Sequence, residues 1–355
     1  MRKLFLSIFY LVLAVLSLLT LKSVAPHLLE RQLLYFLLGY AIFYLTAKIS
    51  FFEWKNFSLI LYALLCLVLF ILLVVGKTTR GISAWISLPG GFKLQPSQMA
   101  IPFTTLFIFT YLKTNTITKL KDFLILLAFI AFPAILILAQ PDLGTALVFL
   151  ASVGSVIFLL KIPIRYLLSV MFVSLVLAIF AWNFVLKDYQ KDRLTGFTSG
   201  YTQENSASFN ARQSLISVGS GKFLGRGLGF GVQSHLKFLP ERQTDFIFAS
   251  LAEEWGFLGS VFIISLYMML SLFLIMVALN VDDFQLSLFS IIMSVMITVQ
   301  AGINMGMNMG ILPITGITLP LLSYGGSSIL AISFMLGLVQ SIINHYQKKI
   351  SLEIR

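Results

Sequence analysis

Apolar residues occur along this chain in long blocks, separated by segments in which the polar and charged residues gather. A helix needs about 20 such residues to cross the roughly 30 Å of hydrocarbon in a bilayer. Blocks near that length predict ten membrane-spanning helices, near residues 4–21, 32–49, 57–75, 96–112, 122–139, 142–160, 165–186, 245–277, 284–307 and 325–345. We find no internal repeat and no appended soluble domain. We therefore predict an all-α polytopic membrane protein, with a single membrane domain over residues 1–355.

The composition supports a lipid environment. Of the 355 residues, 58% are hydrophobic and only 11% are charged, so a soluble domain of this composition could not cover its own surface. The first apolar block precedes Ser23, Val24 and Ala25, which together are similar to a signal-peptidase site. Because this block is longer than the core of a signal peptide, we expect it to be retained as a helix.

Lysine and arginine residues in the short loops predict the orientation. With the N-terminus in the cytoplasm, the inner segments carry twelve basic residues and the short outer loops carry five. The other eight of the 25 lie in residues 187–243, which we predict to be a long extracytoplasmic loop, exempt from the rule because of its length. The segments 76–95, 187–243 and 308–324 would then place the functional residues on the outer face.

The predicted loop 187–243 holds eight basic and four acidic residues, a net charge of +4, and the stretch GSGKFLGRGLGFG. The glycines fit neither the Walker spacing nor the dinucleotide-binding spacing. Two compatible interpretations stay open. The stretch is a flexible loop or a segment in the membrane interface, or it is a basic rim, with Lys222 and Arg226, that attracts an anionic lipid headgroup.

Little else in the sequence points to chemistry. Cys66 is the single cysteine, so we expect no disulfide and no cysteine-ligated metal. The three histidines are scattered without ligand spacing, and the inner loops carry no nucleotide-binding motif.

Four stretches resemble a known family: QPDLGTA (140–146), DYQKDRL (188–194), ARQSLISVGSGKFLGRGLGFGVQSHLKFLPERQTDFIFASLAEEWGFLG (211–259) and NMGMNMGILPITGITLPLLSYGGSS (304–328). Through them the chain resembles the SEDS family (shape, elongation, division and sporulation proteins) over nearly its whole length. FLPERQTDF is more similar to the RodA type than to the division relative FtsW, whose version usually lacks the Glu-Arg pair. The resemblance implies a SEDS fold and peptidoglycan glycosyltransfer, in which lipid II is polymerised on the outer face and undecaprenyl pyrophosphate is released.

Asp245 is the residue that this resemblance singles out. Position alone favours a structural role, because Thr244 can cap a helix and an acid in the first turn stabilises the helix dipole. The matching aspartate of the family is its proposed catalytic residue, and the two roles can coexist. An ionisable group at membrane depth is also costly enough to suggest a function by default.

A single carboxylate suits the implied reaction. Glycosidases use a second one because a sugar alkoxide leaves poorly without an acid. Pyrophosphate is already a stable anion, so what remains is a base for the acceptor hydroxyl and positive charge for the leaving group. We expect Asp245 to be the base. Candidates for the positive charge are a divalent cation (Mg or Mn) and four arginines, Arg80, Arg193, Arg212 and Arg242.

Two further residues admit both a structural and a functional role. Asp142 follows a proline at a predicted helix start, which favours capping, while the resemblance leaves a substrate-binding role open. Trp85 lies in an outer loop, where tryptophan is usually an interfacial anchor. The family carries a tryptophan here that is linked to activity, so Trp85 is also a substrate-binding candidate.

Two polar pairs favour structural roles. Glu253 and Glu254 lie deeper than Asp245 along the same predicted helix, and we expect pairing inside the bundle. Asn304 and Asn308 are four residues apart and share one helix face, which favours amide pairing between helices.

One motif departs from the family. The family pattern Gln-Pro-Ser-Glu is followed by a lysine three residues after the glutamate, whereas this chain has Gln98 and Ile101 at the two positions. Residues three apart meet on a helix, so both members of a predicted ion pair are absent together. Loss of both is tolerable where loss of one would leave a charge without a partner.

These observations predict a RodA-type peptidoglycan glycosyltransferase for cell elongation and rod shape, in the bacterial cytoplasmic (inner) membrane with an outward-facing site. The resemblance implies lipid II as substrate, a class B penicillin-binding protein as crosslinking partner, other elongation-complex membrane proteins, and no nucleic acid. A lipid II flippase is the alternative from another class, but it gives Asp245 no chemical task and we find no inverted repeat. A non-catalytic scaffold stays open because of the departure at Gln98 and Ile101.

Overall fold

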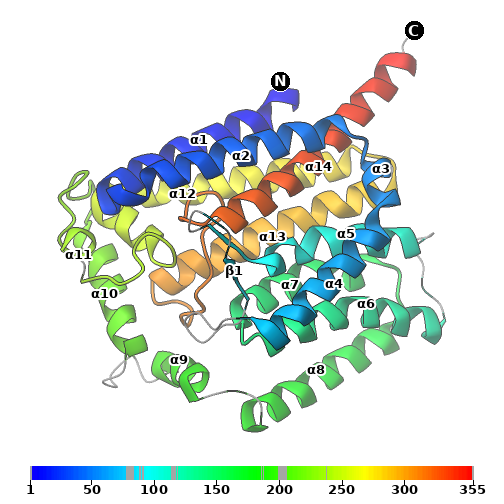
Figure 1. Cartoon of the computed structure of the whole chain (residues 1–355), viewed down its shortest axis with the longest axis horizontal. Coiled ribbons are helices and arrows are strands. Elements are labelled where there is room, and N and C mark those ends of the chain that lie inside the picture. The colour runs from blue at the N-terminus through cyan, green and yellow to red at the C-terminus, as the bar shows by residue number, and fades with distance from the viewer. Residues whose placement is uncertain are drawn as a thin grey trace.

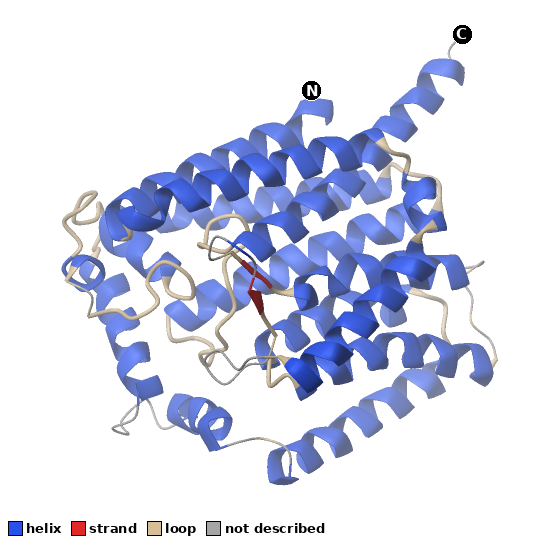
Figure 2. Cartoon of the chain, viewed as in Figure 1, coloured by secondary structure: helices blue, strands red, loops and turns tan. Residues whose placement is uncertain are grey.

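Helices make up most of the part of the chain that the computed structural model describes, which is residues 2–76, 84–87, 89, 92–112, 117, 119–184, 186, 188–198, 206–236 and 238–353 (Figure 2). Eight of the described helices are long and apolar enough to cross a membrane: α1 (Arg2–Val24), α2 (Leu29–Lys48), α4 (Ser58–Val75), α6 (Leu120–Ala139), α8 (Ile164–Phe184), α12 (Ile247–Leu279), α13 (Phe284–Asn308) and α14 (Gly326–Glu353). Two shorter helices, α5 (Ala100–Tyr111) and α7 (Leu143–Leu159), fill the other two predicted blocks. Each predicted block is therefore helical, and the chain is an all-α polytopic membrane protein.

Short elements connect these helices. The first part of the chain adds a turn η1 (Pro26–Leu28) and a short helix α3 (Phe51–Asn56), and a turn η3 (Pro96–Met99) leads into α5. Two short strands, β1 (Ile86–Ser87) and β2 (Lys93–Leu94), pair antiparallel. The predicted long loop 187–243 contains regular structure in α9 (Asp188–Thr198), α10 (Ser206–Ser220) and α11 (Val232–His235).

The centre of the bundle is α14, which packs along α2, while α12 packs along α13 and α13 along α7 (Figure 1). Glycine permits the close contact of α14 with α2. A Cβ atom at Gly337 would lie 2.7 Å from the Thr46 Cβ and 2.8 Å from the Phe43 carbonyl oxygen. Small residues at such contacts let helices approach closely enough for dispersion forces to hold them in lipid. In contrast, α8 lies at the margin of the bundle and most of its side chains are exposed.

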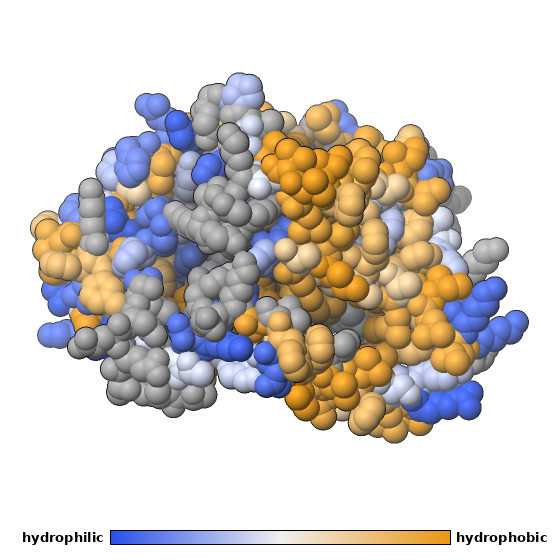
Figure 3. Space-filling model, turned by 60° about the horizontal axis from the view of Figure 1, so that its bottom comes forward, coloured by the Kyte–Doolittle hydropathy of each residue, from blue (hydrophilic) through white to orange (hydrophobic). Residues whose placement is uncertain are grey.

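Large apolar side chains cover the outside of the bundle. Phe132, Phe158, Phe172 and Leu279 are all more than half exposed, as are many others on the long helices. Figure 3 shows these side chains as a broad band, with hydrophilic side chains gathered toward both ends of the molecule. Such a surface would be an aggregation liability in water, but it matches the hydrocarbon core of a bilayer.

Helix α12 is broken at Gly256, whose φ of 69° and ψ of −162° are not helical. The glycine-rich stretch of the long loop pairs with the backbone groups that the break leaves open. Four hydrogen bonds do this: Arg226 N to Glu253 O and Gly227 N to Glu254 O (both 3.0 Å), Phe257 N to Lys222 O (2.9 Å) and Leu258 N to Phe223 O (3.2 Å). The stretch is thus held against α12 by its main chain.

Glycine is required on both sides of this contact. A Cβ atom at Gly225, where φ is 83°, would lie 2.1 Å from the Glu254 carbonyl oxygen, and one at Gly256 would lie 2.2 Å from the Gly225 nitrogen. Both distances are too short for any side chain. The glycines therefore serve a backbone contact.

The carboxylates of Glu253 and Glu254 hold the next part of the same loop. Glu253 accepts hydrogen bonds from the amides of Gln233 (2.9 Å) and Ser234 (3.0 Å). Glu254 accepts from the amide of Gly229 (3.2 Å) and from the Ser23 hydroxyl in α1. The predicted structural role is confirmed, but the partners are mainly loop amides instead of other groups inside the bundle.

The segment between α13 and α14, residues 309–325, returns into the bundle. The Tyr267 hydroxyl in α12 donates to the carbonyl of Pro320 (2.5 Å), and the Ser17 hydroxyl in α1 donates to the carbonyl of Leu322 (2.8 Å). Non-helical backbone at membrane depth is tolerated only where protein surrounds it, as it does here. Part of the predicted outer segment 308–324 is therefore buried inside the protein, as a re-entrant segment.

Candidate functional site

Asp245 lies in a turn, residues 239–246, that connects the long loop to α12. Three successive carbonyls of this turn accept hydrogen bonds from other parts of the chain. Tyr324 N donates to Gln243 O (2.8 Å), the Ser323 hydroxyl donates to Thr244 O (2.6 Å), and two asparagine amides donate to Asp245 O. The re-entrant segment and α13 thereby fix the main chain from which the half-buried Asp245 side chain projects.

Asn304 and Asn308 supply the two amides at Asp245. Their Nδ2 atoms lie 2.9 and 3.0 Å from the Asp245 carbonyl oxygen. Asn304 Nδ2 also donates to Ile317 O (2.6 Å), and Asn308 Oδ1 accepts from the amide of Ala249 (3.0 Å) in the first turn of α12. Of these bonds, only the one between Asn308 and Ala249 joins two helices, as expected. The others reach carbonyls outside helices, at Asp245 and Ile317.

The capping role considered for Thr244 is not what the structure shows. Helix α12 begins at Ile247 after Phe246, and no side chain caps it. The Thr244 hydroxyl instead donates to the carbonyl oxygen and side chain of Glu241 (3.3 and 3.2 Å). Asp245 therefore precedes α12 and lies outside its first turn.

Arg242 is the candidate cation that shares this turn with Asp245. Its Nε donates to the carbonyl of Val24 at the end of α1 (3.1 Å), which leaves its terminal nitrogens for other acceptors. Burial lowers the pKa of the Arg242 guanidinium, but arginine stays protonated at any physiological pH. A fixed positive charge thus lies three residues from the candidate base.

The structure describes the other predicted binding residues to different extents. Arg212 is exposed on α10, and Trp85 is half-buried just before β1. Arg193 belongs to α9, but its side chain lies outside the described residues, as does all of Arg80. Of the arginines that the structure describes, Arg242 lies in the turn of Asp245. Arg212 follows Ala211, which packs in one cluster with Leu239 and Phe246 of that turn.

Asp142 is the N-cap of α7, as its position predicts, and it has a second partner. One carboxylate oxygen accepts from the amide of Thr145 (3.1 Å), and the other accepts from the side-chain amide of Gln95 (2.6 Å). Burial raises the pKa of the Asp142 carboxyl, while the hydrogen bonds from Thr145 and Gln95 oppose that rise. Both oxygens are occupied by the protein itself.

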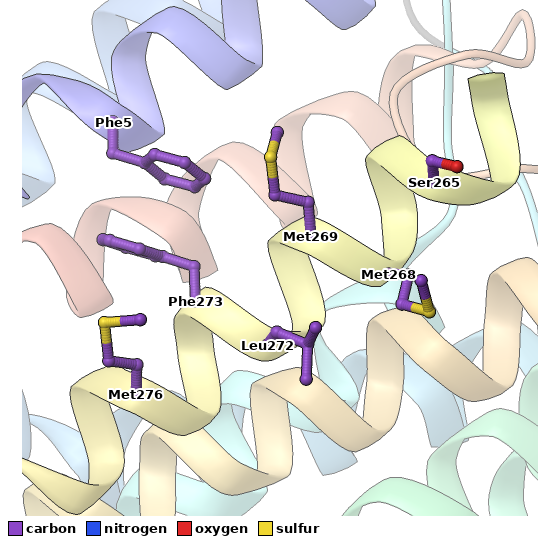
Figure 4. Close-up of a pocket in the computed structure, with 7 residues that line it drawn as sticks. All are labelled: Phe5, Ser265, Met268, Met269, Leu272, Phe273 and Met276. Atoms are coloured by element: carbon purple, nitrogen blue, oxygen red, sulfur yellow. The ribbon is translucent and has the colours of Figure 1, made fainter.

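A groove of about 240 Å³ lies on α12 away from this turn, lined by Phe5, Ser265, Met268, Met269, Leu272, Phe273 and Met276 (Figure 4). The rings of Phe5 and Phe273 stack at its end with centroids 4.0 Å apart. Its one hydroxyl, on Ser265, donates to the carbonyl of Val261 within the same helix. The groove is apolar, so it offers no group for acid–base chemistry.

No three His, Cys, Asp or Glu side chains of the described residues gather closely enough to hold a metal ion. Among the described residues, the turn of Asp245 carries two carboxylates, Glu241 and Asp245, and the guanidinium of Arg242. The Glu241 carboxylate accepts a hydrogen bond from Thr244. A carboxylate can accept a proton, and the guanidinium can stabilise an anion.

Comparison with known proteins decides the family. Residues 2–348 match the family model for FtsW, RodA and SpoVE, described as a cell cycle protein. The chain belongs to the FtsW/RodA/SpoVE family. The resemblance to SEDS proteins is thereby confirmed.

Individual members of the FtsW/RodA/SpoVE family match along most of their length. The peptidoglycan glycosyltransferase MrdB of Escherichia coli (strain K12) is 32% identical over 325 residues, 90% of this chain and 86% of that protein. A chain of a peptidoglycan synthase complex, solved to explain how polymerisation and crosslinking are coordinated, is 31% identical with a TM-score of 0.83, over 96% of this chain and 97% of that one. The rod shape determining protein RodA of Thermus thermophilus is 29% identical with a TM-score of 0.72, over 96% of both chains.

The departure of this family member at Gln98 and Ile101 has a local explanation. Gln98 Nε2 lies 3.4 Å from the side-chain oxygen of Gln95, whose amide in turn donates to Asp142. Ile101 is only 7% exposed and packs in the hydrophobic core. Where the family pattern has an acid and a base, this chain has a glutamine that bonds to Gln95 and an isoleucine that packs in the core.

Sequence reasoning missed Gln95 as the partner of Asp142 and Ser323 as a donor to the turn of Asp245. Gln95 is part of the quoted QPSQ motif, but nothing in the motif shows that its amide reaches residue 142. The hydrogen bonds at Thr244 and Asp245 end on backbone carbonyls. Because every residue carries a carbonyl, the side chains in the sequence do not indicate which carbonyls accept these bonds.

Proposed function

We propose that this chain is a peptidoglycan glycosyltransferase that polymerises lipid II and releases undecaprenyl pyrophosphate, for cell elongation and rod shape. The observation that carries the proposal is the turn of Asp245, whose three carbonyls are held by distant segments while its carboxylate stays half-buried. The relationship to MrdB and RodA supports it.

In the proposed reaction, Asp245 accepts the proton of the acceptor sugar hydroxyl as that oxygen attacks the anomeric carbon of the donor. The bond from that carbon to the pyrophosphate breaks, and the pyrophosphate leaves as an anion that needs no proton. Arg242 stabilises the negative charge on the leaving group. A general base contributes about 10²–10⁴-fold to a rate, and a fixed charge acts most strongly where water is excluded.

A divalent cation, Mg or Mn, remains part of the proposal as a counter-charge for the pyrophosphate. Because no cluster of metal ligands is present among the described residues, such an ion would take most of its ligands from phosphate oxygens and water. Mg²⁺ usually binds in this way, through one or two carboxylates and substrate phosphates.

We also propose that the protein lies in the bacterial cytoplasmic membrane with its N-terminus inside and the turn of Asp245 facing outward. The distribution of lysine and arginine supports this orientation. Its proposed partners are a class B penicillin-binding protein that crosslinks the new strands and other membrane proteins of the elongation complex. The match to a chain of a peptidoglycan synthase complex supports the partnership.

Polymerisation of purified lipid II by an Asp245→Asn variant tests the proposal. The variant should fold, because the amide keeps the shape of the carboxylate and the bonds from Asn304 and Asn308 to the carbonyl of residue 245 are retained. Polymer formation should fall at least 100-fold, since an amide cannot accept the proton. Glu30→Gln, which removes an exposed carboxylate in the first turn of α2, is the matched control and should keep full activity. Glycan chains of normal yield from folded Asp245→Asn protein would overturn the assignment.

A further inference from the structure

Residues 222–230 present exposed apolar side chains that no described part of the protein covers. Phe223 and Leu228 are 60% and 50% exposed, and Leu224 and Phe230 are both 74% exposed. Together with the exposed Lys222 and Arg226, we call these six residues the 222–230 patch. Figure 3 shows apolar side chains gathered at the left margin of the molecule, apart from the main band.

The position of the patch along the axis of α12 is fixed. The four backbone hydrogen bonds at the break, and the glycines that allow them, tie residues 222–227 to residues 253–258. Beyond the break, residues 257–279 of α12 rise 1.5 Å each, which suffices to cross the roughly 30 Å of hydrocarbon. Gly256 therefore lies near the boundary between hydrocarbon and headgroups, and so does the patch.

The patch continues the lipid-facing surface of α12. The ring of Phe223 stacks on that of Phe257, with centroids 5.9 Å apart. Phe257 is itself 57% exposed, and Phe262, farther along the same helix, is 47% exposed. The apolar side chains of the patch thus extend a surface that already faces lipid.

Charge at the patch is entirely positive. Residues 220–236 contain no acidic residue, and the nearby carboxylates of Glu253 and Glu254 are buried and turned toward loop amides. Lys222 and Arg226 are exposed beside the aromatic and leucine side chains. Aromatic residues next to cations are typical of a membrane interface, and cations there attract anionic lipids.

We propose that the 222–230 patch is a bilayer-binding surface at the end of the bundle that carries Asp245. Its apolar side chains insert at the level of the headgroups, and Lys222 and Arg226 bind the headgroups of anionic phospholipids. The inference goes beyond the proposed function and does not depend on it. Of the interpretations that the sequence left open, the proposal combines the interfacial segment with the basic rim and sets the flexible loop aside.

Insertion can be measured with a nitroxide label, because Cys66 is the single cysteine and can be removed. In a Cys66→Ser background, labels at Phe230→Cys, Phe262→Cys and Asn280→Cys are compared in nanodiscs containing phosphatidylglycerol, by their accessibility to oxygen and to a water-soluble nickel chelate. Phe262 is the lipid-facing reference, and Asn280, after the end of α12, is the aqueous one. The ratio of oxygen to nickel accessibility at residue 230 should lie well above that at residue 280. A ratio equal to that at residue 280 would overturn the proposal.

Binding of anionic headgroups by Lys222 and Arg226 is tested by changing the lipid. Replacing phosphatidylglycerol by phosphatidylcholine should lower the ratio at residue 230 about two-fold or more. In the Lys222→Gln, Arg226→Gln double variant, the dependence of the ratio on lipid charge should vanish. The control is the Lys48→Gln, Lys161→Gln double variant, which loses the same charge at two exposed lysines outside the patch and should keep the dependence. A dependence that persists in the first double variant would contradict headgroup binding. A label that is aqueous alone and becomes protected only when a partner protein is added would show a protein contact instead.

Discussion

At the scale of single residues, hydrogen bonds to three carbonyls hold the main chain that carries the Asp245 side chain. The donors belong to Asn304, Asn308, Ser323 and the backbone of Tyr324, which come from α13 and from the re-entrant segment. A main chain held in this way preorganises the site, and preorganised charge is the largest contribution in many active sites.

We predict that Asn308→Ala lowers the turnover of lipid II about ten-fold per folded molecule. The change removes one donor to the Asp245 carbonyl and leaves the Ala249 amide without its partner, at a cost of about 1–3 kcal/mol in stability. Turnover at saturating lipid II, normalised to folded protein by size-exclusion chromatography, is the measurement. Asn344→Ala removes an exposed amide contact of α14 and serves as the control. Unchanged turnover would mean that the other donors suffice to place Asp245.

The residues Gln98 and Ile101 give a second residue-scale prediction. Ile101→Lys alone should destabilise the protein by a few kcal/mol, because the side chain is buried in the core and the cation would lack a partner. Adding Gln98→Glu should restore most of the stability and leave activity near that of the wild type. Melting temperature and polymer yield are compared for both single variants and the double variant. An Ile101→Lys protein as stable as the wild type would contradict the ion-pair account.

The same residue scale shows where sequence reasoning stops. Asp142 as a helix cap followed from a local pattern, because capping depends on neighbours in the chain. The bonds from Gln95 to Asp142 and from Ser323 to Thr244 join residues 47 and 79 positions apart. Such pairs depend on how the helices pack, which no local pattern records.

At the scale of elements, the ten helices were predictable and the break in α12 was not. Crossing hydrocarbon imposes a length and an apolar composition that can be counted along the chain. Gly256, in contrast, is one glycine inside an apolar block, and a glycine there is compatible with a continuous helix. The break becomes stable only because the stretch around Gly225 supplies the missing hydrogen bonds.

We predict that Gly225→Ala and Gly256→Ala each destabilise the protein by more than about 2 kcal/mol. Both positions have positive φ, and a Cβ atom at either would lie about 2 Å from backbone atoms of the other segment. Gly302→Ala in α13 is the control, because a Cβ atom there would meet no other atom within 4 Å, and it should be neutral or slightly stabilising. Melting temperatures in one detergent decide the matter. Equal melting temperatures for all three variants would show that the contact at the break is dispensable.

At the scale of the whole molecule, two kinds of described surface can contact partners. One is the lipid-facing surface of the helices, and the other is formed by residues 206–246, which run from α10 through the turn of Asp245. Helix α8 lies at the margin of the bundle, and the groove of Figure 4 is apolar along α12. Surfaces of this kind bind other membrane helices through shape and dispersion, because lipid is as apolar as they are.

We predict that co-expression with the cognate class B penicillin-binding protein raises polymerase activity severalfold and yields a complex that survives mild detergent. The measurements are co-purification and polymer yield with and without the partner. A catalytically inactive transpeptidase variant of the partner is the control, and it should stimulate equally if contact alone is responsible. Absence of any complex under mild conditions would contradict the partnership.

The contact between Ser17 and Leu322 also constrains the order of biogenesis. These residues are 305 positions apart, so at about 5–20 residues per second the ribosome needs roughly 15–60 s to make the second after the first. During that interval the Ser17 hydroxyl of α1 and the Gln32 amide of α2 lack their final acceptors on the re-entrant segment. A nascent chain that stops before residue 320 therefore has its helices up to α13 but lacks α14 and the donors of Ser323 and Tyr324 to the turn of Asp245. Quality control at the insertion machinery could distinguish finished from unfinished molecules by the polar groups of Ser17 and Gln32 that still lack hydrogen-bond acceptors on the re-entrant segment.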